Sequence, residues 1–280
     1  MSVNKEIAIQ DVMRQLQAKA EAWNVTLEET RETPTSLLGF GVRAGHRVVL
    51  KITKDEGDES HSGKVLEAFN GDGAVRVYEH ETGAVLLERL EPGEQLVNLE
   101  DDKATMILAG VMKKLAHHQA PVECPTVADW GRGFDRYLAS GDRQLPIELV
   151  HEARALYQDL ASTQGTTMLL HGDLQHYNVL FDNERGWIAI DPKGVIGEWE
   201  YEVGPLLRNP VEQPERFANP ETIIRRLEIL TTLLPLNYSR ALRWSYAQSI
   251  LSTIWGLEDG YPLESNNPSL TLARLLRALL

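Results

Sequence analysis

The hydrophobic pattern of the chain changes near residue 90, and this change limits the folds that the chain can adopt. Before it, short segments rich in β-branched residues are separated by glycines or tight turns, which predicts antiparallel strands. These segments are residues 25–31, 36–42, 46–53, 74–80 and 84–90. The last two flank the turn "ETG" and predict a hairpin. After residue 90, long stretches carry apolar residues at helical spacing, as in "DDKATMILAGVMKKLAHHQ" and "PIELVHEARALYQDLASTQ".

The pattern therefore predicts an α+β chain with two lobes. The smaller, strand-rich lobe spans residues 1–90 and opens with a helix over residues 5–22. A short helix is also expected at "VLEAF". The larger lobe spans residues 91–280 and is mainly helical. The Pro-Gly step in "EPGEQL" suits a linker between the lobes.

The amino-acid composition and charge of the chain exclude several classes of protein. The 280 residues include one cysteine, Cys124, which excludes an internal disulfide framework and a cysteine metal cluster. The polar N-terminus does not resemble a signal peptide, and no apolar run approaches the ~20 residues that cross a bilayer. We therefore expect a cytoplasmic protein without a membrane partner. The formal charge of −13 argues against nucleic-acid binding and is compatible with a cationic small-molecule partner, although acidity also serves solubility.

The stretch "HGDLQHYNVL", residues 171–180, lies in the helical half and leads into a hairpin pattern that ends at Asp191. Asp173 follows a glycine that permits a tight turn, and a carboxylate on a loop can orient or deprotonate a hydroxyl. Asn178 and Asp191 offer hard oxygen ligands for Mg²⁺, with nucleotide phosphates supplying the rest. The spacing matches the kinase pattern H-R-D-x-x-x-x-N, with Gly172 in place of arginine. An Asx-type turn followed by a strand-end aspartate is the simpler alternative.

A phosphotransferase also needs a cation for the nucleotide phosphates. Lys51 lies in the apolar strand "HRVVLKIT", like the strand lysine of kinases, so we expect it to contact ATP rather than only solvent. Glu59 and Glu67 are both available as its partner. The backbone near Glu88 and Leu90, where the two lobes join, is expected to bind adenine. The glycines of "GFGVRAG" do not match G-x-G-x-x-G and could simply belong to a hairpin.

These segments resemble the aminoglycoside/hydroxyurea antibiotic-resistance kinases, the group containing streptomycin 6-phosphotransferase, within the protein-kinase-like fold. The resemblance also rests on "GAVRVYEHETGAVLLERLEPG", "WIAIDPKGVIGEWEYEVGPLLRNP" and "ILSTIWGLEDG", and extends from about residue 48 to 260. It implies a two-lobed fold, Asp173 as catalytic base, Asn178 and Asp191 as magnesium ligands, and Lys51 as the ATP-phosphate contact. It also implies a small hydroxylated acceptor such as an aminocyclitol. The segments "HSGKVLEAF" and "GEWEYEVG" depart from the family pattern.

Acidic residues in the C-terminal half could line a site for a cationic acceptor. We expect Glu202, Glu258 and Asp259 to bind it, since paired charges hold a guanidinium or ammonium group. The alternative is that these residues are solvated or cap helices. Glu198 and Glu200 belong to the same acidic group.

Other polar and aromatic residues have structural interpretations. Trp244 and Trp255 are expected in the core, because they share helical spacing with apolar residues. His171 and His176 are expected to support the loop by hydrogen bonds.

The leading hypothesis is an ATP- and Mg²⁺-dependent O-phosphotransferase, a monomer or dimer, that phosphorylates an aminoglycoside such as streptomycin and so confers resistance. A kinase of another small hydroxylated metabolite on the same fold is the first alternative, because fold and motif constrain the acceptor less than the chemistry. A catalytically silent nucleotide-binding module is the second. A protein kinase is disfavoured, since no activation segment follows Asp191.

Overall fold

The chain forms two compact units. The computed structural model describes residues 2–54, 62–121, 123–264 and 267–280. The first unit comprises Met1–Glu94 and Leu180–Gly194, and the second comprises Gln95–Val179 and Val195–Leu280. The division therefore differs from the predicted one at residue 90, because the segment Leu180–Gly194 returns to the first unit.

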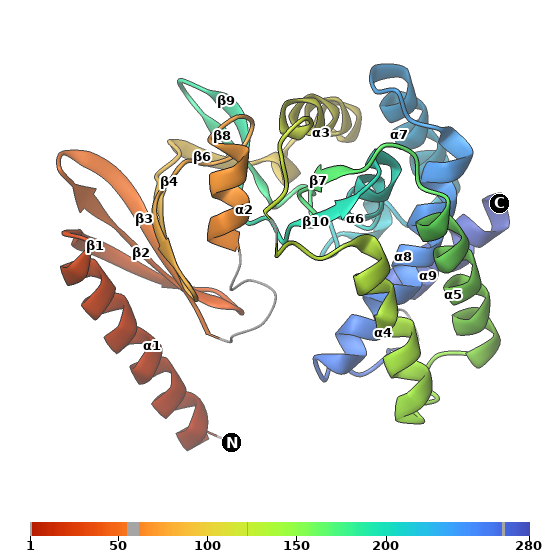
Figure 1. The fold of residues 1–280 in the computed structure, drawn as a ribbon, viewed down its shortest axis with the longest axis horizontal. Coiled ribbons are helices and arrows are strands. Elements are labelled where there is room, and N and C mark those ends of the chain that lie inside the picture. The colour runs from red at the N-terminus through yellow and green to blue at the C-terminus, as the bar shows by residue number, and fades with distance from the viewer. Residues whose placement is uncertain (1, 55–61, 122, 265–266) are drawn as a thin grey trace. The chain divides into compact units, whose positions relative to one another are not determined.

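The first unit is built on a five-stranded antiparallel sheet with the order β1-β2-β3-β5-β4 (Figure 1). Its strands are β1 (Thr26–Glu32), β2 (Ser36–Arg43), β3 (His46–Thr53), β4 (Val77–Glu81) and β5 (Ala84–Glu88). Its helices are α1 (Ser2–Ala22) and α2 (Ser62–Phe69). These elements confirm the predicted strands, the hairpin and both helices.

Helix α1 packs against this sheet and forms the core of the unit with it. Leu16 of α1 is fully buried in one cluster with Leu50 and Leu86 of the strands. Successive strand residues point to opposite faces of a sheet. Because Leu50 faces the α1 side, its neighbour Lys51 lies on the opposite face.

The glycines of "GFGVRAG" are explained by close packing. Gly39 and Gly41 lie inside β2, and a Cβ at Gly41 would meet the Thr26 carbonyl oxygen at 2.2 Å. Gly45, with a φ of 83°, forms the turn to β3 together with Ala44. The segment is thus a strand and a hairpin turn, the simpler of its two interpretations.

A three-stranded sheet with the order β6-β8-β9 completes this part of the chain. Its strands are β6 (Pro92–Gln95), β8 (Val179–Asp182) and β9 (Gly186–Ala189). The predicted linker "EPGEQL" therefore forms a strand, because proline is tolerated as the first residue of an edge strand. Strand β9 joins the rest of the unit through hydrogen bonds of the Ala189 backbone with Gly73 and Val75.

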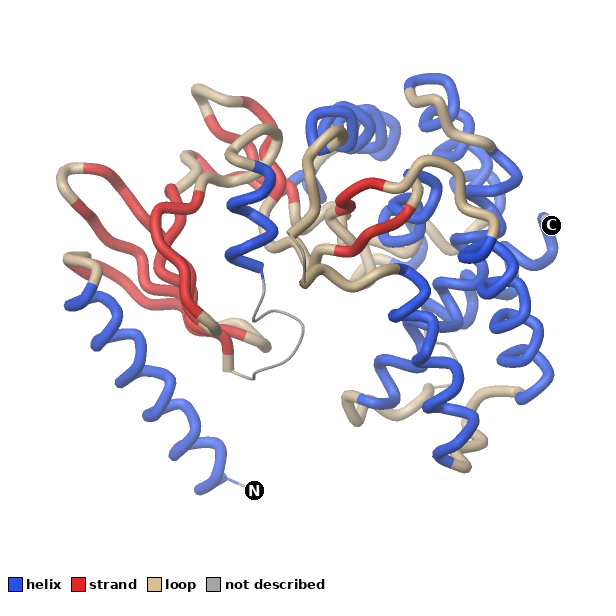
Figure 2. Tube along the Cα trace, in the orientation of Figure 1, coloured by secondary structure: helices blue, strands red, loops and turns tan. Residues whose placement is uncertain are grey.

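The second unit is mainly helical (Figure 2). Its helices are α3 (Asp101–Leu115), α4 (Val127–Ser140), α5 (Ile147–Ser162), α6 (Val203–Leu207), α7 (Pro220–Leu233), α8 (Tyr238–Glu258) and α9 (Pro268–Leu279). Short 3-10 helices occur at η2 (Leu96–Asn98), η3 (Trp199–Glu202) and η4 (Pro214–Arg216), and β7 (Met168–Leu170) pairs with β10 (Val195–Gly197).

Helix α8 is the centre of the second unit. Most of its residues from Ala241 to Ile254 are buried on all sides, as expected of a helix surrounded by others. Helices α4, α5, α6 and α9 pack against it. Across the described ranges, no helix has both the length and the apolar character required to span a membrane.

Candidate active site

Lys51 and Asp191, which were assigned to separate roles from the sequence, are in contact within the first unit. The buried Lys51 ammonium donates a hydrogen bond to Asp191 Oδ1. Asp191 has a φ of 60°, a left-handed conformation that is uncommon for residues other than glycine. Such conformations concentrate at functional sites, because the surrounding structure must hold them.

Glu67 and Glu59 were both considered as partners of Lys51, and the structure describes only Glu67. Glu67 lies on α2 and is largely exposed, with its Oε2 3.2 Å from His80 Nε2. Its side chain is therefore engaged away from Lys51. Glu59 lies outside the described residues.

The backbone near residue 90 provides one available donor. The Glu88 amide donates to the Arg76 carbonyl oxygen at 3.0 Å, and the Glu88 carboxylate is paired with Arg185. In the described part of the chain, the Leu90 amide has no hydrogen-bond partner. Leu90 can therefore donate to an adenine, whereas Glu88 can offer only its carbonyl oxygen.

In the second unit, the loop after β7 holds Asp173 and Asn178 in contact. Asn178 Nδ2 donates to the Asp173 carbonyl oxygen at 2.9 Å and to Asp173 Oδ2 at 3.2 Å. Gly172 permits the turn with a φ of 81°, and a Cβ there would meet the Trp130 ring at 2.8 Å. The chain thus presents a half-buried carboxylate on a loop of fixed shape.

Asn178 in the second unit and Asp191 in the first unit each carry an oxygen of the kind that magnesium prefers. The Asn178 amide directs its nitrogen to Asp173, so its carbonyl oxygen is left for a cation. Asp191 has a second carboxylate oxygen besides the one that accepts from Lys51. Mg²⁺ is held by one or two protein oxygens when nucleotide phosphates and water supply the others.

Glu202 supports the loop from behind. It is 3% exposed and accepts hydrogen bonds from the Gly172 amide at 3.0 Å and the Leu174 amide at 3.4 Å. Burial raises the pKa of Glu202 to about 7, although these backbone donors act in the opposite direction. The prediction that Glu202 binds the acceptor is therefore wrong, because its carboxylate is enclosed and used by the backbone on either side of Asp173.

The two histidines of the loop behave differently. His171 Nδ1 accepts from the Asp173 amide at 3.2 Å, which confirms its predicted supporting role. His176 is fully buried, and neither ring nitrogen has a hydrogen-bond partner among the described residues. Burial lowers the pKa of His176 to about 3, so the ring is neutral and acts as an apolar filler.

A cation also lies beside Asp173. Arg208, at the end of α6, places Nη2 3.7 Å from Asp173 Oδ1, and its side chain is only 13% exposed. Burial lowers the pKa of Arg208, and the nearby Asp173 carboxylate acts in the opposite direction. Arg208 was not among the residues predicted from sequence, although an arginine in the apolar segment "VGPLLRNP" was the available signal.

Comparisons with known proteins identify the family of the chain. The sequence profile of the aminoglycoside/hydroxyurea antibiotic resistance kinases matches residues 23–260. The chain belongs to this family. A streptomycin 6-kinase from Streptomyces glaucescens is 30% identical over 241 residues, which cover 83% of this chain and 78% of the relative. A streptomycin 3''-kinase from Klebsiella pneumoniae is 29% identical over 250 residues, which cover 86% of this chain and 91% of the relative.

Solved structures confirm the kinase-like fold of this antibiotic-resistance kinase. A thermostable mutant of an aminoglycoside phosphotransferase, crystallised with AMP-PNP and hygromycin B, superposes with a TM-score of 0.69 at 15% identity. The superposition covers 94% of this chain and 98% of the other. The predicted combination of an antiparallel sheet and a helical remainder is therefore confirmed.

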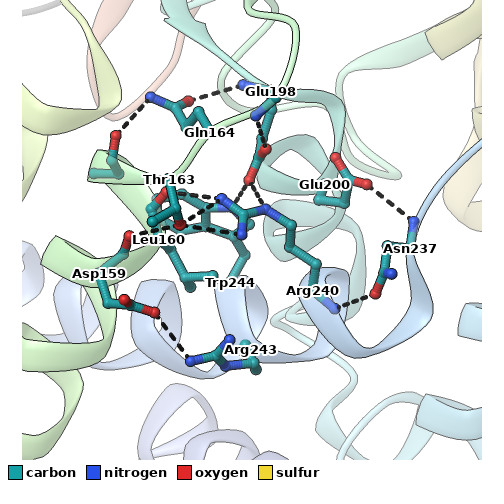
Figure 3. A network of polar contacts seen from close by, with 12 residues as sticks. Asp159, Leu160, Thr163, Gln164, Glu198, Glu200, Asn237, Arg240, Arg243 and Trp244 are labelled. Atoms are coloured by element: carbon teal, nitrogen blue, oxygen red, sulfur yellow. Dashed lines mark hydrogen bonds and ion pairs between the residues drawn. The ribbon is translucent and has the colours of Figure 1, made fainter.

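Glu198 and Glu200 of the kinase are structural residues (Figure 3). Glu198 is 3% exposed, and its Oε1 accepts from Arg240 and from the Trp244 indole. Its Oε2 accepts from the Gly165 amide at 2.9 Å. Glu200 Oε1 accepts from the Asn237 amide at 2.9 Å, which ties η3 to the start of α8.

The end of α8 contains the other two predicted acceptor residues. Glu258 forms a two-point contact with Arg136, with Nε and Nη2 each 3.1 Å from a carboxylate oxygen. This contact occupies the face with which Glu258 would hold a guanidinium ligand. Asp259 is exposed and makes no ion pair with any described residue. The geometry thus leaves Asp259 available and Glu258 engaged.

Trp244 and Trp255, both predicted to lie in the core, differ in how deeply they are buried. Trp244 is fully buried, as predicted. Trp255 is only half-buried and packs edge-on against Trp130, with ring centroids 5.5 Å apart. Because Trp130 also contacts Gly172, the pair lies beside the loop that carries Asp173. Trp130 was not among the residues predicted from sequence.

Proposed function

We propose that this kinase transfers the γ-phosphoryl group of ATP to a hydroxyl of streptomycin or a related aminoglycoside, with Mg²⁺ as the metal. The observation that carries the proposal is the contact between Asn178 Nδ2 and Asp173, which fixes a carboxylate and a metal-binding amide on one loop. Loops of this composition position an acceptor hydroxyl for in-line transfer.

Asp173 acts as the catalytic base in this proposal. The acceptor oxygen bonds to the γ-phosphorus while the bond from that phosphorus to the β–γ bridging oxygen breaks, and ADP leaves. The hydroxyl proton passes to the Asp173 carboxylate. Mg²⁺, when bound, neutralises charge on the phosphates. Asn178 and Asp191 would hold it through their side-chain oxygens.

The residues of the first unit bind the nucleotide. Lys51 contacts the ATP phosphates, exchanging its ion pair with Asp191 for the negatively charged phosphate oxygens. The Leu90 amide donates to adenine, and the Glu88 carbonyl oxygen accepts from it.

The acceptor is a cationic molecule. A net charge of −13 raises the local concentration of cations around the protein. Asp259 is the predicted acceptor residue that remains available, and Glu258 would contribute only by releasing Arg136. Streptomycin carries guanidinium groups and hydroxyls, which combine the two features that such a site requires.

The test is consumption of ATP by the purified protein, with and without streptomycin, in Mg²⁺ and after its removal by EDTA. Streptomycin should stimulate turnover in Mg²⁺ only, and mass spectrometry should show one added phosphate on the drug. Lys51→Met should raise the KM for ATP. If another hydroxylated metabolite stimulates turnover and aminoglycosides do not, that metabolite is the acceptor instead of an aminoglycoside. If the protein binds nucleotide but turns over no acceptor, it is a catalytically silent nucleotide-binding module.

A further inference from the structure

Arg208 occupies a position that the proposed chemistry does not yet use. Its guanidinium is mostly buried at the end of α6 and lies 3.7 Å from Asp173 Oδ1. This separation is that of an ion pair and exceeds hydrogen-bond length. A buried cation is costly unless it is compensated, so its placement beside the predicted base requires a reason.

The guanidinium is anchored from the opposite side. Arg208 Nη1 donates to Gln248 Oε1 at 3.2 Å, and Gln248 Nε2 donates to the Tyr201 carbonyl oxygen at 2.6 Å. Gln248 lies on the central helix α8 and is buried. Its amide is thus fixed at both ends, and it holds the guanidinium at one nitrogen.

The backbone makes room for this anchor. A Cβ at Gly204, in α6, would lie 1.9 Å from Gln248 Oε1. No side chain larger than hydrogen fits there unless Gln248 moves. The close approach of α6 and α8 at Gly204 therefore lets Gln248 reach Arg208.

Both oxygens of the Asp173 carboxylate then face a fixed group. Oδ2 accepts a hydrogen bond from Asn178 Nδ2 at 3.2 Å, and Oδ1 faces the Arg208 guanidinium. The terminal torsion of an aspartate is broad, so a carboxylate without such contacts samples many orientations. Contacts at both oxygens select one orientation.

We propose that Arg208, held by Gln248, is a positioning residue that orients the Asp173 carboxylate for the acceptor hydroxyl. The inference rests on the proposed function, because it assumes that Asp173 is the base. It assigns roles in phosphoryl transfer to Arg208, Gln248 and Gly204. A small misplacement of a catalytic group can lower the rate about 100-fold.

The test is steady-state kinetics of Arg208→Met and Arg208→Lys with ATP and streptomycin. Arg208→Met should lower kcat about 100-fold while both KM values stay within about threefold, because orientation of the base affects transfer rather than binding. Arg208→Lys should recover much of the loss, since it keeps a cation beside Asp173. A kcat equal to that of the wild type, a loss confined to KM, or a lysine variant as slow as the methionine variant would each overturn the inference.

A second variant tests the anchor while Arg208 stays in place. Gly204→Ala displaces Gln248 and should lower kcat without changing KM, whereas Gly256→Ala on α8 meets nothing within 4 Å and should behave as the wild type. If Arg208→Met does not fold, the comparison of Gly204→Ala with Gly256→Ala tests the inference instead. A Gly204→Ala variant with the kcat of the wild type overturns it.

Failure of the proposed function is distinguishable from failure of this inference. A wild-type protein that streptomycin does not stimulate refutes the proposed acceptor. The same variants are then compared for hydrolysis of ATP, in which water replaces the acceptor hydroxyl. Equal hydrolysis rates in wild type and Arg208→Met would overturn the positioning role.

Discussion

At the scale of single residues, the loop around Asp173 is held by groups with different chemistry. The buried Glu202 carboxylate accepts hydrogen bonds from backbone amides of the loop, and Asn178 and Arg208 face the Asp173 carboxylate. His171 caps the Asp173 amide. The exposed part of the loop is therefore small, and most of its shape depends on buried partners.

The raised pKa of Glu202 predicts a pH dependence of stability. Burial raises this pKa from 4.5 to about 7, so the native state holds a proton that the unfolded chain releases between these values. The stabilisation is complete below pH 4.5 and is lost as the pH rises through 7. The free energy of unfolding of the wild type, relative to Glu202→Gln, should fall by about 3 kcal/mol between pH 4 and pH 8.

Urea unfolding of the two proteins across this pH range measures the difference directly. Groups common to both proteins cancel in the comparison. A difference that stays constant would show that folding does not raise the pKa of Glu202, and a difference that grows with pH would show that the backbone donors stabilise its ionised carboxylate.

At the scale of elements, Glu198 ties three parts of the second unit together. Its carboxylate joins the start of η3 to Arg240 and Trp244 of α8, and to the Gly165 amide just after α5. Arg240 in turn donates to the Leu160 carbonyl oxygen of α5 at 2.8 Å. Removing the charge of the buried Glu198 leaves the partly buried Arg240 cation without compensation.

Glu198→Gln should therefore lower the free energy of unfolding by about 3 kcal/mol. The matched control is Glu200→Gln, which keeps an oxygen for the Asn237 amide and should cost less than about 1 kcal/mol. Denaturant unfolding of both variants tests the difference. Equal losses in the two variants would show that Glu198 is not the junction of these elements.

Some elements of the structure were predictable from the sequence, and others were not. Strand β3 was predictable because the segment is rich in β-branched residues, and the two-residue period of a strand places Lys51 on the face opposite to Leu50 and Ile52. The loop residues Asp173 and Asn178 were predictable from spacing alone. Strand β6 was missed because Pro92 and Gly93 ordinarily interrupt structure.

Three-dimensional contacts explain why the acidic residues were hard to assign from sequence. A sequence does not reveal that the Gly172 amide already uses the carboxylate of the buried Glu202, or that Arg136 pairs with the exposed Glu258. Arg208 and Gln248 lie 40 residues apart, and their contact depends on how α6 packs on α8. Contacts of this kind follow from packing rather than from local pattern.

At the scale of the whole molecule, the first unit is discontinuous in sequence. The segment Leu180–Gly194 contributes Asp191 to Lys51 and Arg185 to Glu88, and its Ala189 pairs with the backbone near residue 74. Residues 1–94 alone lack all of these contacts.

We therefore expect a fragment of residues 1–94 to lack a cooperative thermal transition. The same fragment joined to residues 180–194 by a short Gly-Ser linker should regain one, because the contacts of the returning segment are restored. Calorimetry of the two fragments measures the difference. A cooperative transition in residues 1–94 alone, at the same temperature as in the joined fragment, would show that the returning segment does not stabilise the first unit.

In the function that we propose, Asp173 accepts the proton during phosphoryl transfer to an aminoglycoside. The most direct measurement is transfer of labelled phosphate from γ-³²P-ATP to streptomycin by wild type and Asp173→Ala. We expect labelled streptomycin with the wild type and a loss of at least about 1,000-fold in kcat with the variant, while ATP binding is retained. Labelled streptomycin formed at similar rates by both proteins would contradict this role of Asp173.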